Sequence, residues 1–316
     1  MEHDLHILLD GFVDDAMIER LLASNAIYLN YYLNKDFNAR TVVGDDPSTM
    51  DNKYYGNNDV KGPRSDHGTS VAGVIAAQRN NEIGINGIAS NVKIMTLRST
   101  PDGDERDKDV ALAIIYAVDN GADIINMSFS KDLSPQKEFV DSAVRYAEKH
   151  GVLLVHGAGN KGLDLDLNES FPSDIYLDRT EPTNWLNVGA THIYLDKELC
   201  GVFSNYGMKH VDIFAPGVDV VSLDSSNTYI ETSGTSIAAP ILTGIAALIL
   251  SYYPDLEPAD LITILMESSH KVTKPKKVLI PNLSEPKRKK VKFSTLSKSG
   301  GIVNAYNAFN YINTNQ

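Results

Sequence analysis

The sequence has one cysteine, Cys200, and one tryptophan among its 316 residues. A single thiol cannot form an intrachain disulfide, so the chain is not a disulfide-stabilised scaffold and its redox compartment stays open. The eight histidines show no HExxH pair and no other metal-ligand spacing. We therefore expect no catalytic metal and no cofactor required for the chemistry.

Positive charge and long apolar runs are also scarce. The chain has 29 Lys and Arg against 41 Asp and Glu, a net charge of −12, which argues against general binding of nucleic acid. Its most apolar run, residues 237–250, is too short for a membrane span, which needs about 20 residues. A basic stretch at 271–290 departs from the rest. Basic runs of this kind can bind nucleic acid or act as localisation signals, but the pattern here favours a surface hairpin with strands at 278–280 and 291–293.

The composition suits a single globular enzyme, with 42% hydrophobic and 22% charged residues. Its middle part predicts a helix over 109–118, a strand over 123–127, a helix over 135–150 and a strand over 152–155. This alternation is typical of a parallel sheet. In such sheets the carboxyl ends of the strands lie together on one rim, where ligands bind.

The segment around Ser236 has the features of a nucleophile at the mouth of a buried helix. Gly-Thr precedes the serine, and small apolar residues follow it as far as Pro240. Proline fits the first turn of a helix, and the helix N-terminus adds positive potential near any developing negative charge. The alternative is an ordinary helix N-cap.

Two further motifs favour a catalytic role for Ser236 over an ordinary helix N-cap. His67 stands before Gly-Thr at the start of another small-residue helix, where an imidazole titrating near neutrality can act as a base. The alternative is a structural histidine. Asn160 follows the strand at 152–155 and can donate to an oxyanion, a contact worth roughly 2.7–4 kcal/mol. Residues 157–162 also read GxGxxG, but the acidic, irregular stretch after them predicts no helix and so disfavours a dinucleotide site.

These three motifs resemble those of the subtilisin-like serine peptidases, the subtilases. The resemblance extends to segments 86–95, 124–128, 203–207 and 213–217. It implies a three-layer subtilisin-like α/β fold, with a central mostly parallel sheet and helices on both faces. We expect the peptidase domain to span 51–316, after a partly helical flank at 1–50 that is the remnant of an insertion.

The resemblance also assigns roles to residues. It makes Ser236 the nucleophile, His67 the base and Asn160 the oxyanion-hole donor.

It further places Ser128, Gly157 and Gly159 beside the pocket for the substrate residue before the scissile bond. Ser130 stands where family members often have glycine, which predicts a tighter pocket edge, and Phe129 is expected in the core. The implied partner is a polypeptide substrate, and we expect a secreted or periplasmic monomer. Structural calcium is common in the family, but no loop here can be assigned to it.

The family's catalytic aspartate, usually followed by Thr-Gly or Ser-Gly, is not evident before His67. Asp10 is the nearest candidate, but Gly-Phe-Val follows it, and residues 14–23 predict a helix. Segments 28–38 and 55–63 resemble a bacterial subgroup with a long insertion between the aspartate and the histidine. We therefore expect the chain to begin inside this insertion, with the aspartate strand upstream, which fits the lack of a signal peptide.

Two functions follow from the sequence. The first is a serine endopeptidase that forms an acyl-enzyme intermediate. The second is a truncated or non-catalytic subtilase relative that at most binds peptides. A lipase-type G-x-S-x-G elbow is excluded, because Ala238 occupies its last position and His67 precedes the serine.

Overall fold

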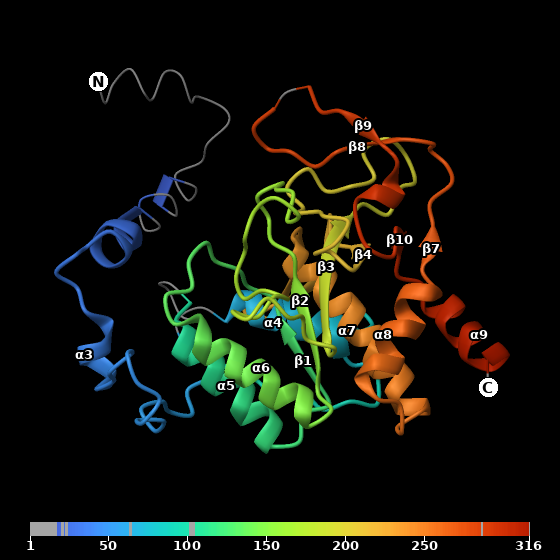
Figure 1. Ribbon diagram of the computed structural model, residues 1–316. Helices are drawn as coiled ribbons and strands as arrows, with labels where there is room; N and C mark the ends of the chain where they lie inside the picture. The colour runs from blue at the N-terminus through green and yellow to red at the C-terminus, as the bar shows by residue number, and fades with distance from the viewer. Residues whose placement is uncertain are drawn as a thin grey trace. The chain divides into compact units, whose positions relative to one another are not determined.

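The computed structural model describes residues 18–19, 22, 25–62, 65–100, 105–285 and 287–315 (Figure 1). The chain divides into two compact units, residues 1–57 with 100–104, and residues 58–99 with 105–316. Asp10 and most of the helix predicted over 14–23 lie outside the described residues. The domain boundary predicted after residue 50 stays a prediction.

Among the described residues of the smaller unit are the short helices η1 (Tyr28–Tyr32) and α3 (Ala39–Val43). Asn38 caps α3, because its Oδ1 accepts a hydrogen bond of 2.9 Å from the backbone N–H of Arg40. Gly44 ends the helix with a φ of 68°, a left-handed conformation that glycine adopts without strain. The buried Arg40 guanidinium lies 3.1 Å from the carboxylate of Asp45. Local caps and this ion pair thus stabilise α3.

The larger unit is built on a six-stranded sheet in the order β1-β2-β3-β4-β10-β7. Its strands are β1 (Ile124–Met127), β2 (Leu153–Gly157), β3 (Trp185–Thr191), β4 (Ile213–Pro216), β10 (Gly301–Ile302) and β7 (His270–Lys271). The first five are parallel, and β7 is antiparallel to β10. Every residue of β2 and β3 is buried, as expected for parallel strands covered on both faces.

Helices cover both faces of this sheet. They are α4 (Asp66–Ala76), α5 (Asp107–Asp119), α6 (Lys137–Lys149), α7 (Thr235–Tyr252), α8 (Pro258–Glu267) and α9 (Ala305–Asn315). Helices α5 and α6 lie on one side of the sheet, and α7 and α8 lie on the other (Figure 1). The main core joins Leu153 of β2 and Leu186 of β3 to Leu242 of α7, all fully buried. The predicted three-layer fold is therefore confirmed.

The predicted elements of the middle region are also present. Helix α5, strand β1, helix α6 and strand β2 match the predicted segments, with boundaries that differ by one or two residues. No helix opens within residues 157–162. The dinucleotide interpretation therefore lacks the structural context that it requires.

Helix α7 differs from the prediction in two ways. It runs for 18 residues rather than 14, so Pro240 lies in its second turn and not its first. By length and composition alone, α7 is the one helix in the described part of the chain that could cross a membrane. However, 61% of this stretch is buried within the fold, and a core helix of a soluble protein passes the same test.

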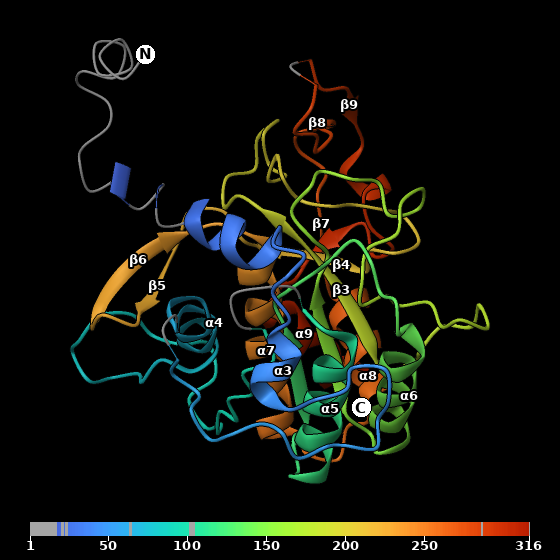
Figure 2. The same cartoon turned by 90° about the vertical axis from the view of Figure 1, so that its left-hand side faces the viewer.

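Two hairpins complete the larger unit. Strands β5 (Val220–Asp224) and β6 (Thr228–Thr232) pair beside α4 (Figure 2). Strands β8 (Val278–Leu279) and β9 (Lys290–Val291) form the hairpin predicted in the basic stretch. The predicted second strand ends early, because the buried Phe293 opens a short 3-10 turn, η2 (Phe293–Thr295). Strand β10, which precedes α9, was not predicted.

Candidate active site

Ser236 is the second residue of α7 and is half-buried. It follows Gly234, where an added Cβ would lie 2.8 Å from Ser236 Oγ and 3.4 Å from Asn160 Nδ2. The hydroxyl of the predicted nucleophile and the amide of the predicted oxyanion donor thus border the same small space. The absence of a side chain at Gly234 keeps that space open.

The orientation of the Asn160 amide is fixed by Thr235. Asn160 Oδ1 accepts hydrogen bonds from Thr235 N, at 2.8 Å, and from Thr235 Oγ1, at 3.0 Å. A backbone N–H can only donate, so the oxygen must face Thr235, and the NH₂ group is the end that borders the space at Gly234, beside Ser236 Oγ. The amide therefore presents donors on the side of the serine.

Thr235 is a residue whose role the sequence did not reveal. Its side chain is buried, and its Oγ1 also accepts a hydrogen bond of 3.0 Å from the backbone N–H of Gly159. One hydroxyl therefore ties the start of α7 to the loop after β2. The Gly-Thr-Ser motif contains this threonine, but no local pattern identifies its hydrogen-bond partners.

Gly157 and Gly159 allow this close approach. A Cβ at Gly157 would lie 2.9 Å from the carbonyl oxygen of Thr235. Gly159 has a φ of 104°, and a Cβ there would lie 2.5 Å from Asn205 Nδ2. Asn205 is buried and donates to the carbonyl of Ala158 at 2.8 Å, so it fixes the loop from the other side. Neither glycine can be replaced without displacing backbone or a buried amide.

Ser128 contacts the backbone of Ser236. Pro240 has no N–H, so it cannot form the helical hydrogen bond to the carbonyl of Ser236, four residues earlier. Ser128 Oγ donates to this carbonyl instead, at 2.7 Å. Asn126 Nδ2 donates to Ser128 Oγ at 2.8 Å, and Thr243 Oγ1 donates to Asn126 Oδ1 at 2.9 Å. A polar chain from β1 thereby holds the start of α7.

The segment after β1 lies next to the loop that follows β2. Ser130 Oγ is 3.3 Å from the position of a Cβ at Gly159. The structure therefore brings Ser128, Ser130 and Gly159 to one edge of the sheet. Phe129 was expected in the core, but it is half-buried, because the chain leaves the sheet at this point.

His67 is the second residue of α4, and hydrogen bonds to β5 hold this helix in place. Ser70 Oγ donates to the carbonyl of Leu223 at 2.8 Å, and Ser222 Oγ donates to the carbonyl of Ser70 at 2.7 Å. These reciprocal bonds fix α4 against β5. Helix α4 also packs against α7, so the two helices that begin with the predicted base and nucleophile are neighbours.

The imidazole of His67 is less constrained than its helix. The residue is exposed to solvent, yet partial burial of the imidazole lowers its pKa from the ordinary value, and the negative charge of Asp66 opposes this shift. Within the described part of the chain, the ring forms no hydrogen bond, either to Ser236 or to a carboxylate. Catalytic hydrogen bonds are often long or absent before substrate binds.

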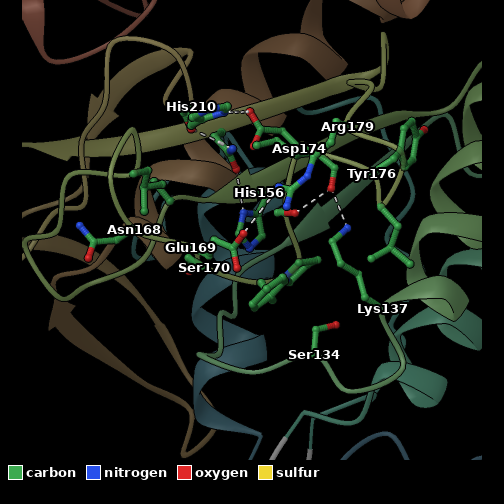
Figure 3. A pocket seen from close by; sticks show the side chains of 18 residues that line it. Ser134, Lys137, His156, Asn168, Glu169, Ser170, Asp174, Tyr176, Arg179 and His210 are labelled. Atoms are coloured by element: carbon green, nitrogen blue, oxygen red, sulfur yellow. Dashed lines mark hydrogen bonds and ion pairs between the residues drawn. The ribbon is translucent and has the colours of Figure 1, made fainter.

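A cavity of about 300 Å³ lies between α6, β2 and the loops that carry residues 165–179 and His210 (Figure 3). Its wall includes Lys137 of α6, His156 of β2, and Asp174 and His210 from loops. None of the predicted site residues lines it. In the described ranges, no group of three or more His, Cys, Asp or Glu residues could hold a metal ion.

Comparisons with known proteins agree with this architecture. The model of the Subtilase family matches residues 11–298. The thermophilic serine proteinase of Bacillus sp. (strain AK1) is 37% identical over 221 residues, which cover 70% of this chain and 49% of that protein. Subtilisin-like protease 1 of Plasmodium berghei (strain Anka) is 30% identical over 263 residues, with coverages of 77% and 43%. The chain spans about half the length of these curated relatives or less.

Solved structures show the same fold. The prenylagaramide maturation protease PagA is 27% identical, with a TM-score of 0.60 and coverages of 78% of this chain and 82% of that one. The epidermin leader peptide processing protease EpiP from Staphylococcus aureus has a TM-score of 0.62 at 23% identity, with coverages of 79% and 63%. The family match extends over most of the sequence, and the fold agrees with it. The chain therefore belongs to the subtilase family of serine proteases.

Proposed function

We propose that this chain is a serine endopeptidase that hydrolyses peptide bonds through an acyl-enzyme intermediate. Ser236 is the nucleophile, His67 the general base and Asn160 the oxyanion-hole donor. The observation that carries this proposal is the orientation of the Asn160 amide, whose oxygen accepts hydrogen bonds from Thr235 and whose NH₂ group borders the space at Gly234, which Ser236 Oγ also borders. Donors placed in advance where negative charge develops are a main source of catalysis in acyl transfer.

The proposed chemistry follows from these positions. Ser236 Oγ attacks the carbonyl carbon of the scissile bond while His67 takes the hydroxyl proton. The negative oxygen of the tetrahedral intermediate receives hydrogen bonds from Asn160 Nδ2 and from an N–H in the first turn of α7, which has no partner within the helix. The intermediate collapses, and the amine leaves with the proton from His67. Water then repeats these steps and releases the acid.

We also propose that Ser128, Gly157 and Gly159 flank the pocket for the substrate residue before the scissile bond. Their support is their place at the carboxyl ends of β1 and β2, close to the start of α7. Ser130, beside Gly159, narrows this edge. The proposed substrate is a polypeptide, and the proposed enzyme is a secreted or periplasmic monomer that needs no cofactor for the chemistry.

A second candidate function is a non-catalytic relative that binds peptides. It is favoured by one observation, that no carboxylate in the described ranges bonds to the His67 ring. A triad needs such a group to orient the imidazole and to stabilise its charged form. Asp10 is the candidate within the chain.

Labelling with a fluorophosphonate probe separates the two functions. Ser236 Oγ would displace fluoride from phosphorus, and the proton would pass to His67. The purified chain, shown to be folded by circular dichroism, is compared with Ser236→Ala and Asp10→Asn. Loss of labelling in Ser236→Ala alone is the expected result.

The other outcomes are equally informative. Loss in both variants would identify Asp10 as the orienting carboxylate. No labelling of the folded wild-type chain would overturn the proposal that this polypeptide is itself an active peptidase, and would favour the peptide-binding relative.

A further inference from the structure

His156 is a buried histidine that the proposed reaction does not use. It lies in β2, directly before Gly157, and only 2% of it is exposed. Its Nδ1 is 2.8 Å from Oδ1 of Asn187 on β3. Its Nε2 is 2.8 Å from the carbonyl oxygen of Phe129, in the segment between Ser128 and Ser130. The ring thus connects the interior of the sheet to the proposed substrate groove.

The oxygen of Asn187 must be the atom that faces His156. Asn187 Nδ2 donates to the carbonyl of His210 at 2.9 Å, and Trp185 Nε1 donates to Asn187 Oδ1 at 3.0 Å. Turning the amide over would break both bonds. Both nitrogens of the His156 ring therefore face hydrogen-bond acceptors. A neutral imidazole carries one N–H and can satisfy only one of them, whereas the imidazolium satisfies both.

The surroundings of the ring favour its neutral form. Burial lowers the pKa of His156 from the ordinary value, and the bonds to Asn187 and Phe129 oppose this shift. Six titratable or charged residues share the cavity wall with it, namely Lys137, Glu169, Asp174, Tyr176, Arg179 and His210 (Figure 3).

In the described part of the chain, none of these six groups bonds to the His156 ring. Lys137 is paired with Asp141, and His210 is paired with Asp174. The carboxylate of Asp212 accepts a hydrogen bond from the backbone N–H of Asn187, so it neighbours the residue that contacts His156.

We propose that His156 is a positioning residue for the substrate groove, which fixes the Phe129 carbonyl when its ring is protonated and releases it when the ring is neutral. The released contact is the one to Phe129, because Asn187 is held within β3 while Phe129 lies in a loop. When His156 is protonated, its hydrogen bonds connect the segment from Ser128 to Ser130 to β2 and β3. In the neutral form, a lone pair faces the carbonyl and this edge loosens.

The expected effect on substrate binding rests on the proposed function, whereas the expected titration of the His156 ring does not. Loosening one groove edge weakens substrate binding. The bond from Ser128 to the carbonyl of Ser236 is separate, so the nucleophile keeps its position. We therefore expect KM to rise with pH as His156 loses its proton, by about 5-fold for one hydrogen bond of about 1 kcal/mol. We expect no matching change in kcat.

The single tryptophan supplies a test that needs no activity. The rings of Trp185 and His156 lie 5.3 Å apart, and an imidazolium quenches indole fluorescence more strongly than a neutral imidazole. We expect the emission of Ser236→Ala protein to rise with pH, with a midpoint below the ordinary histidine value. This transition should vanish in His156→Gln. It should move to higher pH in Asn187→Asp, where a carboxylate stabilises the charged ring.

Two variants control for other titrations. His150→Gln removes an exposed histidine that follows α6 and precedes the start of β2, whereas His156 lies near the other end of that strand, so the transition should be unchanged. Asp212→Asn removes the buried carboxyl nearest Asn187, whose pKa burial raises to about 6. If the transition belongs to His156, it persists in both variants.

The kinetic arm uses succinyl-Ala-Ala-Pro-Phe p-nitroanilide as the substrate, with KM and kcat measured against pH. Wild type should show the rise in KM, and His156→Gln should show a flat profile. The inference is overturned if the fluorescence transition is absent or survives in His156→Gln. It is also overturned if both proteins share one KM profile, because the histidine is then only structural. A fluorescence transition without labelling or turnover contradicts the proposed peptidase and leaves the titration of His156 intact.

Discussion

The first turns of α7 and α4 are built differently, although each carries a predicted catalytic residue in its second position. At the start of α7, Thr235 bonds to Asn160 and Gly159, and Ser128 bonds to the carbonyl of Ser236. At the start of α4, the hydrogen bonds to β5 begin at Ser70, one turn beyond the histidine. The backbone of α4 is anchored, but the His67 ring is exposed on its surface.

This difference separates two requirements of acyl transfer. Stabilising an oxyanion needs donors that are in place before the reaction, and the α7 region has them. A general base must be oriented but must also exchange protons, so it needs a partner for its second nitrogen. In the proposed mechanism, the region at the start of α7 serves the first requirement, whereas the described residues give the proposed base a fixed helix but no partner for its ring. The two regions can therefore be probed separately.

The largest expected effect tests whether the two regions act as one unit. His67→Ala and Ser236→Ala should each lower kcat by up to about 10⁶-fold, the size measured for subtilisin, a member of the same family. The double variant should be no slower than either single one, because each removes the same proton-coupled attack. Steady-state turnover of a peptide substrate measures this. Effects that multiply would show that the serine and the histidine act independently.

Asn160→Ala should have the next largest effect. It removes the NH₂ donor and should lower kcat by about 10²–10³-fold with little change in KM. Asn160→Asp should lose as much, although its oxygen can still accept from Thr235. The control is Asn168→Ala, which removes an exposed amide bonded to the carbonyl of Asp164. An Asn160→Asp enzyme with normal kcat would contradict the assigned orientation.

The polar chain behind Ser236 can be tested by a double-mutant cycle. Ser128→Ala should lower the free energy of unfolding by about 1–3 kcal/mol, because the carbonyl of Ser236 loses its donor. In a Pro240→Ala background the loss should shrink, since the new N–H can donate to that carbonyl. Denaturant unfolding measures both. Ser142→Ala removes a similar side-chain-to-carbonyl bond on the exposed face of α6, and it should lower the free energy of unfolding by less. Equal losses of unfolding free energy in the two backgrounds would contradict the idea that Ser128 replaces the helical hydrogen bond that Pro240 cannot form.

The smallest expected effect concerns the pKa of His67. Labelling by the fluorophosphonate should increase as pH rises through this pKa, because only the neutral ring accepts a proton. The midpoint should lie below the ordinary histidine value, because burial lowers the pKa. Asp66→Asn should lower it further by removing a charge that raises it. Glu138→Gln, in the first turn of α6, is the control. An unchanged midpoint in Asp66→Asn would show that Asp66 does not influence the base.

Several features of the site were predictable from the sequence. The Gly-Thr-Ser and His-Gly-Thr motifs and the strand before Asn160 placed three side chains at the ends of elements that a parallel sheet brings together. Pro240 was expected in the first turn of its helix but lies in the second, because α7 begins at Thr235, and helix boundaries are the least certain part of a prediction from sequence. Strand β10 was missed because two residues carry no periodic pattern.

The sequence by itself determined the alternation of helices and strands, the family and the residue types of the proposed site. These depend on local pattern and on motif spacing. Only the tertiary structure decided which atoms face each other, because the partners are far apart in the chain. Thr235 is hydrogen-bonded to Asn160, which lies 75 residues away, and Ser128 is bonded to the carbonyl of Ser236, 108 residues away. His156 is bonded to Asn187, 31 residues away. Such pairings follow from the register of the sheet and the packing of α7 against it, which no local pattern encodes.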